Sequence, residues 1–147
     1  MRWQRLYNPL VRVLLRSPLG KWLGRSLLLL TYTGRRSGQR YTIPVGYVRN
    51  GDTLVVMSPR TRVWWRNLRS GAPVSVRLAG RELRGRGTLS DSPEATIDGL
   101  LTVLRAAPRY QRALGVRLST GGKPADPAAL EVLAQRYVVV RIAGLEP

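Results

Sequence analysis

The sequence predicts an α+β protein that is mainly β: a six-stranded antiparallel barrel with a helical segment before it and helices beside it. Short apolar runs of strand length follow one another between Gly, Pro and Asn-Gly turn signals. A last apolar run follows a helical stretch, as expected for a barrel closed by a late strand. Because no repeat or linker divides the chain, we expect one domain, residues 1–147, with core strands at 26–90 and helices plus a closing strand at 91–147.

Residues 1–25 are predicted to form a broken helical segment. Asn8-Pro9 and Ser17-Pro18 each place a capping residue before a proline, which is typical of helix starts. Apolar positions recur at helical spacing among basic and aromatic side chains. The pattern fits a helix packed on the barrel and also a basic helix lying on a membrane surface, and the two interpretations are compatible.

The first two strands are expected at 26–33 and 39–49. Pro44 lies inside the second run, and because proline cannot donate to a ladder it marks an edge strand or a bulge. Asn50-Gly51 predicts a tight hairpin turn. The third strand then follows at 53–58.

A short helix is expected at 61–70, between the third and fourth strands. The strands at 73–79 and 81–89 alternate apolar with polar residues, so each should turn one face to the core. Gly85 and Gly87 predict a bend in the second of them.

The C-terminal third should be mostly helical. Asp91 and Glu94 stand at the spacing of a capping box, which predicts a helix start. The elements expected after it are a helix to 106, a short helix at 108–114, a loop at 119–126, a helix at 127–136 and a closing strand at 137–142.

Composition excludes several kinds of chemistry. The chain has no Cys and no His, so it has no disulfide, cysteine-based zinc site, thiol nucleophile or histidine base, and we expect no metal site. The Leu27–Leu30 run is too short for a signal core or a membrane span. We therefore expect a cytoplasmic protein whose basic N-terminal segment can touch a membrane surface.

The net charge of +17 is concentrated in the first two thirds of the chain, where residues 1–90 contain 18 basic and 2 acidic side chains. Most of the basic residues are Arg, whose planar fork matches carboxylate or phosphate oxygens in pairs. The charge predicts an anionic partner: a phosphorylated ligand, an acidic lipid surface or a nucleic acid. An Arg-rich solvated surface would explain part of the count, but not the shortage of acidic residues before residue 91.

The turn between the first two strands is a candidate anion site. In Gly34-Arg35-Arg36-Ser37-Gly38, glycines allow positive φ, and backbone N–H groups, two guanidinium groups and a hydroxyl can surround an oxyanion. The alternative is an exposed charged turn without a ligand.

Trp64-Trp65-Arg66-Asn67-Leu68 is the second candidate element. Two adjacent Trp cannot share one helix face, so one ring can stack on a flat ligand while the other enters the core. Asn67 lies on the face of Trp64. The alternative is two core aromatics with a capping Asn.

Tyr32, Tyr41 and Tyr47 are candidate proton donors or stacking walls, although tyrosines on strands usually just pack. No carboxylate pair is placed for acid–base work, and no phosphate loop of the nucleotidase kind is present. A barrel that binds a flat, phosphorylated cofactor fits these residues better than a self-sufficient hydrolase, because the cofactor supplies the difficult chemistry.

The sequence resembles the deazaflavin-dependent nitroreductase and quinone reductase family, the split β-barrel flavin-binding-like proteins. The resemblance covers about residues 5–90 and is carried by the run at 27–40, Pro44-Val45, Asn50-Gly51-Asp52, Val55–Ser58, Trp64–Leu68 and Pro73–Val76. It implies a split barrel of the FMN-binding type, binding of reduced coenzyme F-420, and hydride transfer to quinones, nitroaromatics or other unsaturated acceptors.

The resemblance also implies the cofactor contacts. They are Arg35, Arg36, Ser37, Gly38, Gln39, Arg40, Tyr41, Pro44, Met57, Ser58, Arg60, Trp64 and Asn67. Arg35, Arg36, Arg40 and Arg60 would hold the phosphate and polyglutamate tail. The link at 59–63 is shorter than in better-known members at the place where the coenzyme phosphate is held, and Arg60 or Arg62 can compensate.

Other functions remain open at this point. A barrel of the same fold could bind FMN, heme or a lipid without deazaflavin chemistry, and a basic nucleic-acid-binding module is a third, less favoured interpretation. We expect a small-molecule substrate, and the family is often dimeric, which suggests a homodimer.

Overall fold

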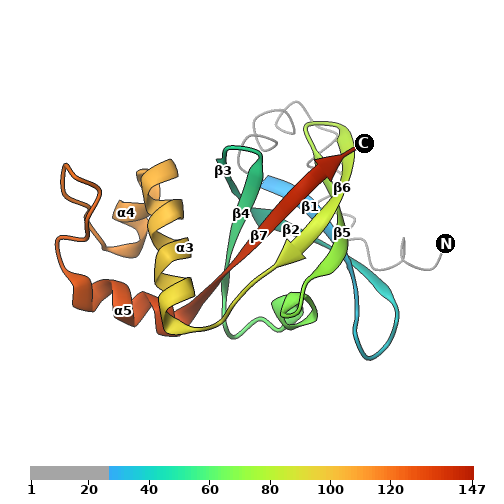
Figure 1. The fold of residues 1–147 in the computed structure, drawn as a ribbon, viewed down its shortest axis with the longest axis horizontal. Helices are drawn as coiled ribbons and strands as arrows, with labels where there is room; N and C mark the ends of the chain where they lie inside the picture. Colours follow the sequence, from blue (N-terminus) through green and yellow to red (C-terminus); the bar gives the residue numbers. More distant parts are fainter. Residues whose placement is uncertain (1–26) are drawn as a thin grey trace.

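The computed structural model describes residues 27–147; the N-terminal segment and its expected membrane contact lie outside this part of the chain. Strands, a 3₁₀ helix (η2) and α-helices follow one another in the described part (Figure 1). Their bounds are β1 Leu27–Thr33, β2 Arg40–Gly46, β3 Val48–Asn50, β4 Thr53–Pro59, η2 Trp64–Leu68, β5 Ala72–Leu78, β6 Arg81–Thr88, α3 Pro93–Ala106, α4 Arg109–Leu114, α5 Pro127–Arg136 and β7 Tyr137–Glu146. Over residues 27–147, no helix is long and apolar enough to cross a membrane.

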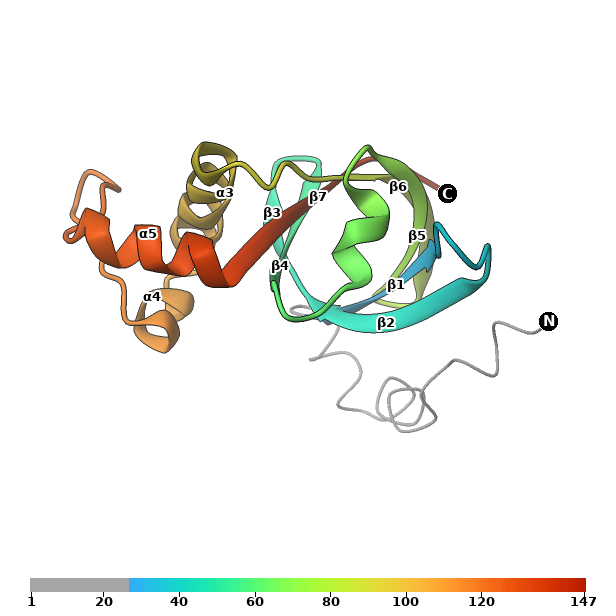
Figure 2. The ribbon, with the colours of Figure 1, turned by 90° about the horizontal axis from the view of Figure 1, so that it is seen from below.

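The strands form one antiparallel sheet in the order β2-β1-β5-β6-β7-β4-β3. β2 and β3 lie at opposite ends of this order, yet only Tyr47 separates them in the chain. The chain therefore passes from one end of the sheet to the other and curls it into a barrel, seen end-on in Figure 2. This confirms the mainly β split-barrel fold.

The described sheet has seven strands and not the expected six, because the run expected at 39–49 is divided at Tyr47 into β2 and β3. Pro44 pairs with Leu29 on β1, and β2 has no second neighbour in the sheet order. An edge strand has one unpaired side, on which a missing N–H costs no ladder hydrogen bond. The edge position predicted for Pro44 is confirmed.

Alternating side chains of the strands fill the barrel. Val74, Val76 and Leu78 of β5 are buried, while Arg77 between them is exposed.

β6 departs from regular pairing with β7 between Arg84 and Arg86. At Gly85, between them, a Cβ would lie 2.7 Å from the carbonyl oxygen of Ala143. The predicted bend in this strand is confirmed, because only glycine allows so close an approach of two backbones.

The three helices form a lobe, α3 to α5, beside the outer face of β4 and β7 (Figure 1). Apolar side chains of α3 and α5 share a second core with outward-facing residues of these strands, including Val55 and Val139. Gly99 lets α3 approach closely, since a Cβ there would lie 2.7 Å from Cβ of Val139. β4 thus separates two cores, the barrel interior and the helical lobe.

The start of α3 differs from the expected capping box of Asp91 and Glu94. Ser92 is the N-cap, and its hydroxyl accepts a hydrogen bond from Ala95 N at 3.2 Å. Asp91 instead forms an ion pair with Arg69 at 3.2 Å. Serine is as good a cap as aspartate, and proline directly after it fits the first helical position.

Candidate functional site

A tight turn joins β1 to β2 at the end of the barrel where η2 lies. Gly34 N donates to Gln39 O at 2.7 Å, and Gly38 N donates to Gly34 O at 2.9 Å. Gly38 has a φ of 68°, the left-handed region that glycine favours. A Cβ on Gly34 would lie 2.7 Å from Oγ of Ser37, so a side chain there would displace the Ser37 hydroxyl from its place in this compact turn.

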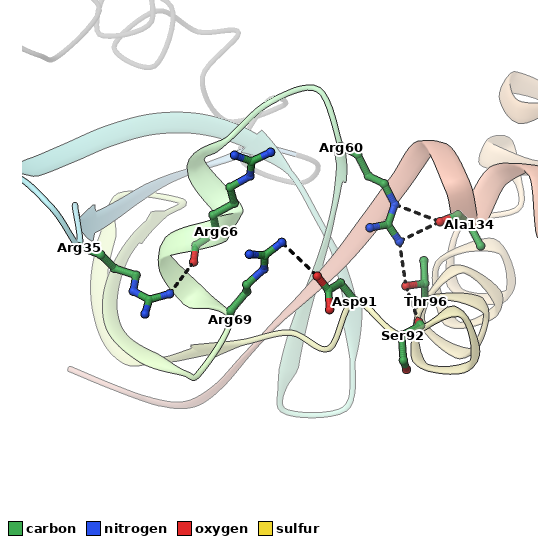
Figure 3. Close-up of polar contacts among 8 residues, drawn as sticks. All are labelled: Arg35, Arg60, Arg66, Arg69, Asp91, Ser92, Thr96 and Ala134. Carbon is green, nitrogen blue, oxygen red and sulfur yellow. Dashed lines mark hydrogen bonds and ion pairs between the residues drawn. The ribbon is translucent and has the colours of Figure 1, made fainter.

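Asn67 fastens this turn to η2. Its Oδ1 accepts a hydrogen bond from Arg35 N at 2.8 Å, and its Nδ2 donates to Trp64 O at 2.9 Å. The guanidinium group of Arg35 adds a longer hydrogen bond, 3.4 Å, to Arg66 O (Figure 3). Two candidate elements that lie about thirty residues apart in the sequence are therefore joined, with Asn67 as the link.

The joined turn and η2 form a basic rim. Arg36 and Arg40 are exposed, and neither guanidinium group has a hydrogen bond or ion pair to residues 27–147. Arg66 and Arg69 lie over the ring of Trp65, with Cζ 5.7 and 5.1 Å from its centroid. Arg36 and Arg40 match an oxyanion-bearing ligand, because a free guanidinium fork binds carboxylate or phosphate oxygens in pairs.

η2 closes the barrel end with its apolar side chains. Trp64, Trp65 and Leu68 are all buried, so both Trp rings enter the core and neither presents an open face, unlike the arrangement expected from their adjacency. Nε1 of Trp64 donates to Oγ of buried Ser58 at 3.0 Å. The barrel interior at this end is therefore packed.

The three candidate tyrosines differ in accessibility. Tyr32 and Tyr47 are buried, and burial is the main cause that raises the pKa of each; for Tyr32 the neighbouring Tyr41 adds to it, and for Tyr47 Arg49 opposes it. Tyr41 stacks on Tyr32 with ring centroids 5.6 Å apart.

The hydroxyl of Tyr41 reaches the turn. It lies 3.2 Å from Oγ of Ser37 and donates to Oε1 of Gln39 at 3.4 Å. Ser37 also accepts from Gln39 N at 3.2 Å. Of the three tyrosines, Tyr41 is the one whose hydroxyl hydrogen-bonds with the candidate anion site.

Two of the predicted site residues point elsewhere. Arg60 donates from Nε and Nη2 to Ala134 O at 3.1 and 2.9 Å, and from Nη2 to Oγ1 of Thr96 at 3.4 Å (Figure 3). This guanidinium therefore ties β4 to the end of α5. Met57 packs against the helical lobe, on the face of β4 opposite to Ser58.

Sequence reasoning missed the parts played by Arg66 and Arg69, which lie over the Trp65 ring. Their spacing from Trp65 was a usable signal, because Arg side chains often cover a neighbouring indole ring. It also missed Asp91 as the partner of Arg69.

No group of side chains in residues 27–147 could hold a metal ion.

The curled antiparallel sheet of seven strands places the described part of the chain among the small split β-barrels. Residues 5–118 match the profile of the F420H(2)-dependent quinone reductase family. The match spans most of the chain, including the turn and η2, so the chain belongs to this family of oxidoreductases, whose cofactor is F-420. Among curated proteins, none matches the chain.

Solved structures share the fold. An F-420-dependent reductase (FDR-A) matches with a TM-score of 0.52 and 19% identity, over 83% of this chain and 95% of that one. A Bacteroides thetaiotaomicron protein described as a 5-nitroimidazole antibiotic resistance protein matches with a TM-score of 0.54 and 14% identity, over 87% and 77%. An FAD and heme binding protein from Mycobacterium smegmatis matches with a TM-score of 0.50 and 20% identity; 87% of this chain is covered, but only 65% of that protein.

Proposed function

We propose that this chain is a deazaflavin-dependent oxidoreductase that transfers a hydride from reduced F-420 to a quinone, a nitroaromatic or a similar unsaturated acceptor. The observation that carries the proposal is the family match over residues 5–118. Arg36 and Arg40 of the basic rim support it, because a coenzyme with a phosphate and a polyglutamate tail needs unpaired cations.

Arg36 and Arg40 would hold the coenzyme's anionic tail, with the hydroxyl of Ser37 beside them. Both guanidinium groups are exposed and unpaired in the described part of the chain, so binding need not break an internal contact. Asn67 would act mainly as a positioning residue, since its Oδ1 and its Nδ2 already form hydrogen bonds with backbone atoms of the protein. Arg60 fits a structural role better, because Ala134 and Thr96 occupy its guanidinium.

Reduced F-420, when bound, supplies the hydride. Because side chains fill the barrel interior, we place the coenzyme's ring outside it, against the outer end of the barrel near Pro44 and the turn. Reduction of a quinone also consumes a proton, and Tyr41 is our candidate donor because its hydroxyl lies at the turn. Tyr32 is buried within the aromatic stack and is less suited to meet a substrate.

The proposal is tested by titrating the purified full-length chain with F-420 and, separately, with FMN, and following absorbance and Trp fluorescence. Tight binding of F-420, followed by oxidation of its reduced form when a quinone or a nitroaromatic is added, supports the proposal. Comparing the two acceptors then decides between quinone reductase and nitroreductase activity. Absence of F-420 binding under conditions where the chain is folded refutes it.

A second candidate is a cofactor-binding barrel that uses FMN, FAD or heme and has no deazaflavin activity. The observation in its favour is the shared fold with the Mycobacterium smegmatis protein that binds FAD and heme. Preferential FMN binding in the same titration would support it.

Three expectations from the sequence remain predictions: a homodimer, a cytoplasmic location, and one functional domain over residues 1–147. Light scattering at several protein concentrations tests the homodimer.

A further inference from the structure

The helical lobe contains a cavity that the proposed reaction does not use. α4, the loop after it and the start of α5 form the walls of an open cavity of about 630 Å³, a size typical of small-molecule sites. The lobe and the β1–β2 turn lie on opposite sides of the molecule in Figure 1. A ligand in this cavity would therefore be independent of the coenzyme site.

The cavity wall is held in place by the protein itself. Gly115 ends α4 with a φ of 70° and turns the chain so that Val116 is almost fully buried. The side chain of Gln111 donates to Leu104 O at 3.3 Å and accepts from Leu118 N at 3.1 Å. The amide of Gln111 thus ties α3, α4 and the following loop together, so the cavity exists before a ligand arrives.

The charges lining the cavity are unbalanced. Arg112 and Arg117 both line it, and neither has an ion pair or a side-chain hydrogen bond to residues 27–147. The one carboxylate in the lining is Asp126, whose Oδ1 accepts from Ala128 N at 3.1 Å and so caps α5. The lining therefore contains two basic residues and one carboxylate, and that carboxylate is already engaged by a backbone N–H.

We propose that this cavity binds a small organic carboxylate with an apolar body. Arg112 and Arg117 would bind the carboxylate, because guanidinium forks match its two oxygens. Pro108 and Ala129 in the lining offer apolar surface for the rest of the ligand. A bare inorganic anion would use the charges but not this apolar surface, so it should bind more weakly.

Titration of the ¹⁵N-labelled full-length chain with benzoate, followed by amide chemical shifts, tests the proposal. Saturable shifts should centre on Gly115, Val116 and Ala129, and inorganic phosphate should give weaker binding at the same amides. Arg112→Gln combined with Arg117→Gln should raise the benzoate dissociation constant at least about tenfold, the loss expected for charge-assisted hydrogen bonds. Asp126→Asn should lower it, because a repelling charge is removed while the cap is kept.

Arg81→Gln is the matched control, since it removes the same charge from an exposed position on β6. It should leave the benzoate dissociation constant unchanged. Shifts centred outside the cavity, an unchanged constant in the double variant, or equal loss in the control would each overturn the proposal. F-420 binding by the double variant should equal that of the wild type, and this also shows that the variant is folded.

Discussion

Replacing Asn67 by Ala should detach the β1–β2 turn from η2. The substitution removes two hydrogen bonds, 2.8 Å from Arg35 N and 2.9 Å to Trp64 O. Each is worth about 0.5–1.5 kcal/mol net. Because Arg35 is exposed and its N–H can regain water, we expect a total loss of about 1–2 kcal/mol in the free energy of unfolding.

Urea unfolding followed by Trp fluorescence measures this loss, and the Arg35 amide shift in NMR spectra without coenzyme reports the missing contact directly. Asn67→Asp keeps the acceptor, so the Arg35 amide should stay hydrogen-bonded in that variant. Asn50→Ala is the control, because Asn50 is exposed at a hairpin end. If Asn67→Ala leaves the Arg35 amide and F-420 affinity as in the wild type, the positioning role is refuted.

Three further predictions concern the two cores and the lobe. Gly99→Ala should destabilise the fold by about 1–3 kcal/mol, because its Cβ would overlap Val139; an unchanged urea midpoint would contradict the close approach. Arg60→Met should cost about 2 kcal/mol by leaving a helix-end carbonyl without its cation, yet leave F-420 affinity intact; weaker binding at unchanged stability would place Arg60 in the coenzyme site. Since burial raises the pKa of Tyr32 above 10.0, its contribution to stability is complete below pH 10.0 and is lost as pH rises through the folded-state pKa. The alkaline decline in stability should be shallower in Tyr32→Phe, and identical pH profiles would argue against the raised pKa.

Local sequence rules were sufficient to predict much of the barrel. Strand alternation in β5, the edge position of Pro44 and the bend at Gly85 each depend on neighbours in sequence and on one backbone property. The division of the second strand at Tyr47 could not be read in this way. It arises because the chain must leave one edge of the curled sheet and join the other, which is a property of the whole barrel.

The candidate site shows the same division between local and long-range information. The basic turn and the Trp-Asn element could both be recognised along the chain, but their joining by Asn67 depends on a contact across thirty-two residues. Arg60 looked equally suited to an anionic ligand in the sequence. Only the position of α5 shows that Ala134 O occupies its guanidinium.

The most direct test of the central claim is the F-420 dissociation constant of Arg36→Glu compared with Arg81→Glu. Both variants make the same change in net charge on an exposed residue, but only Arg36 lies in the turn. We expect Arg36→Glu to weaken binding by much more than tenfold, since a charge-assisted contact becomes a repulsion, and Arg81→Glu to stay close to wild type. Equal affinities in the two variants would contradict the assignment of the turn as the coenzyme's anion site.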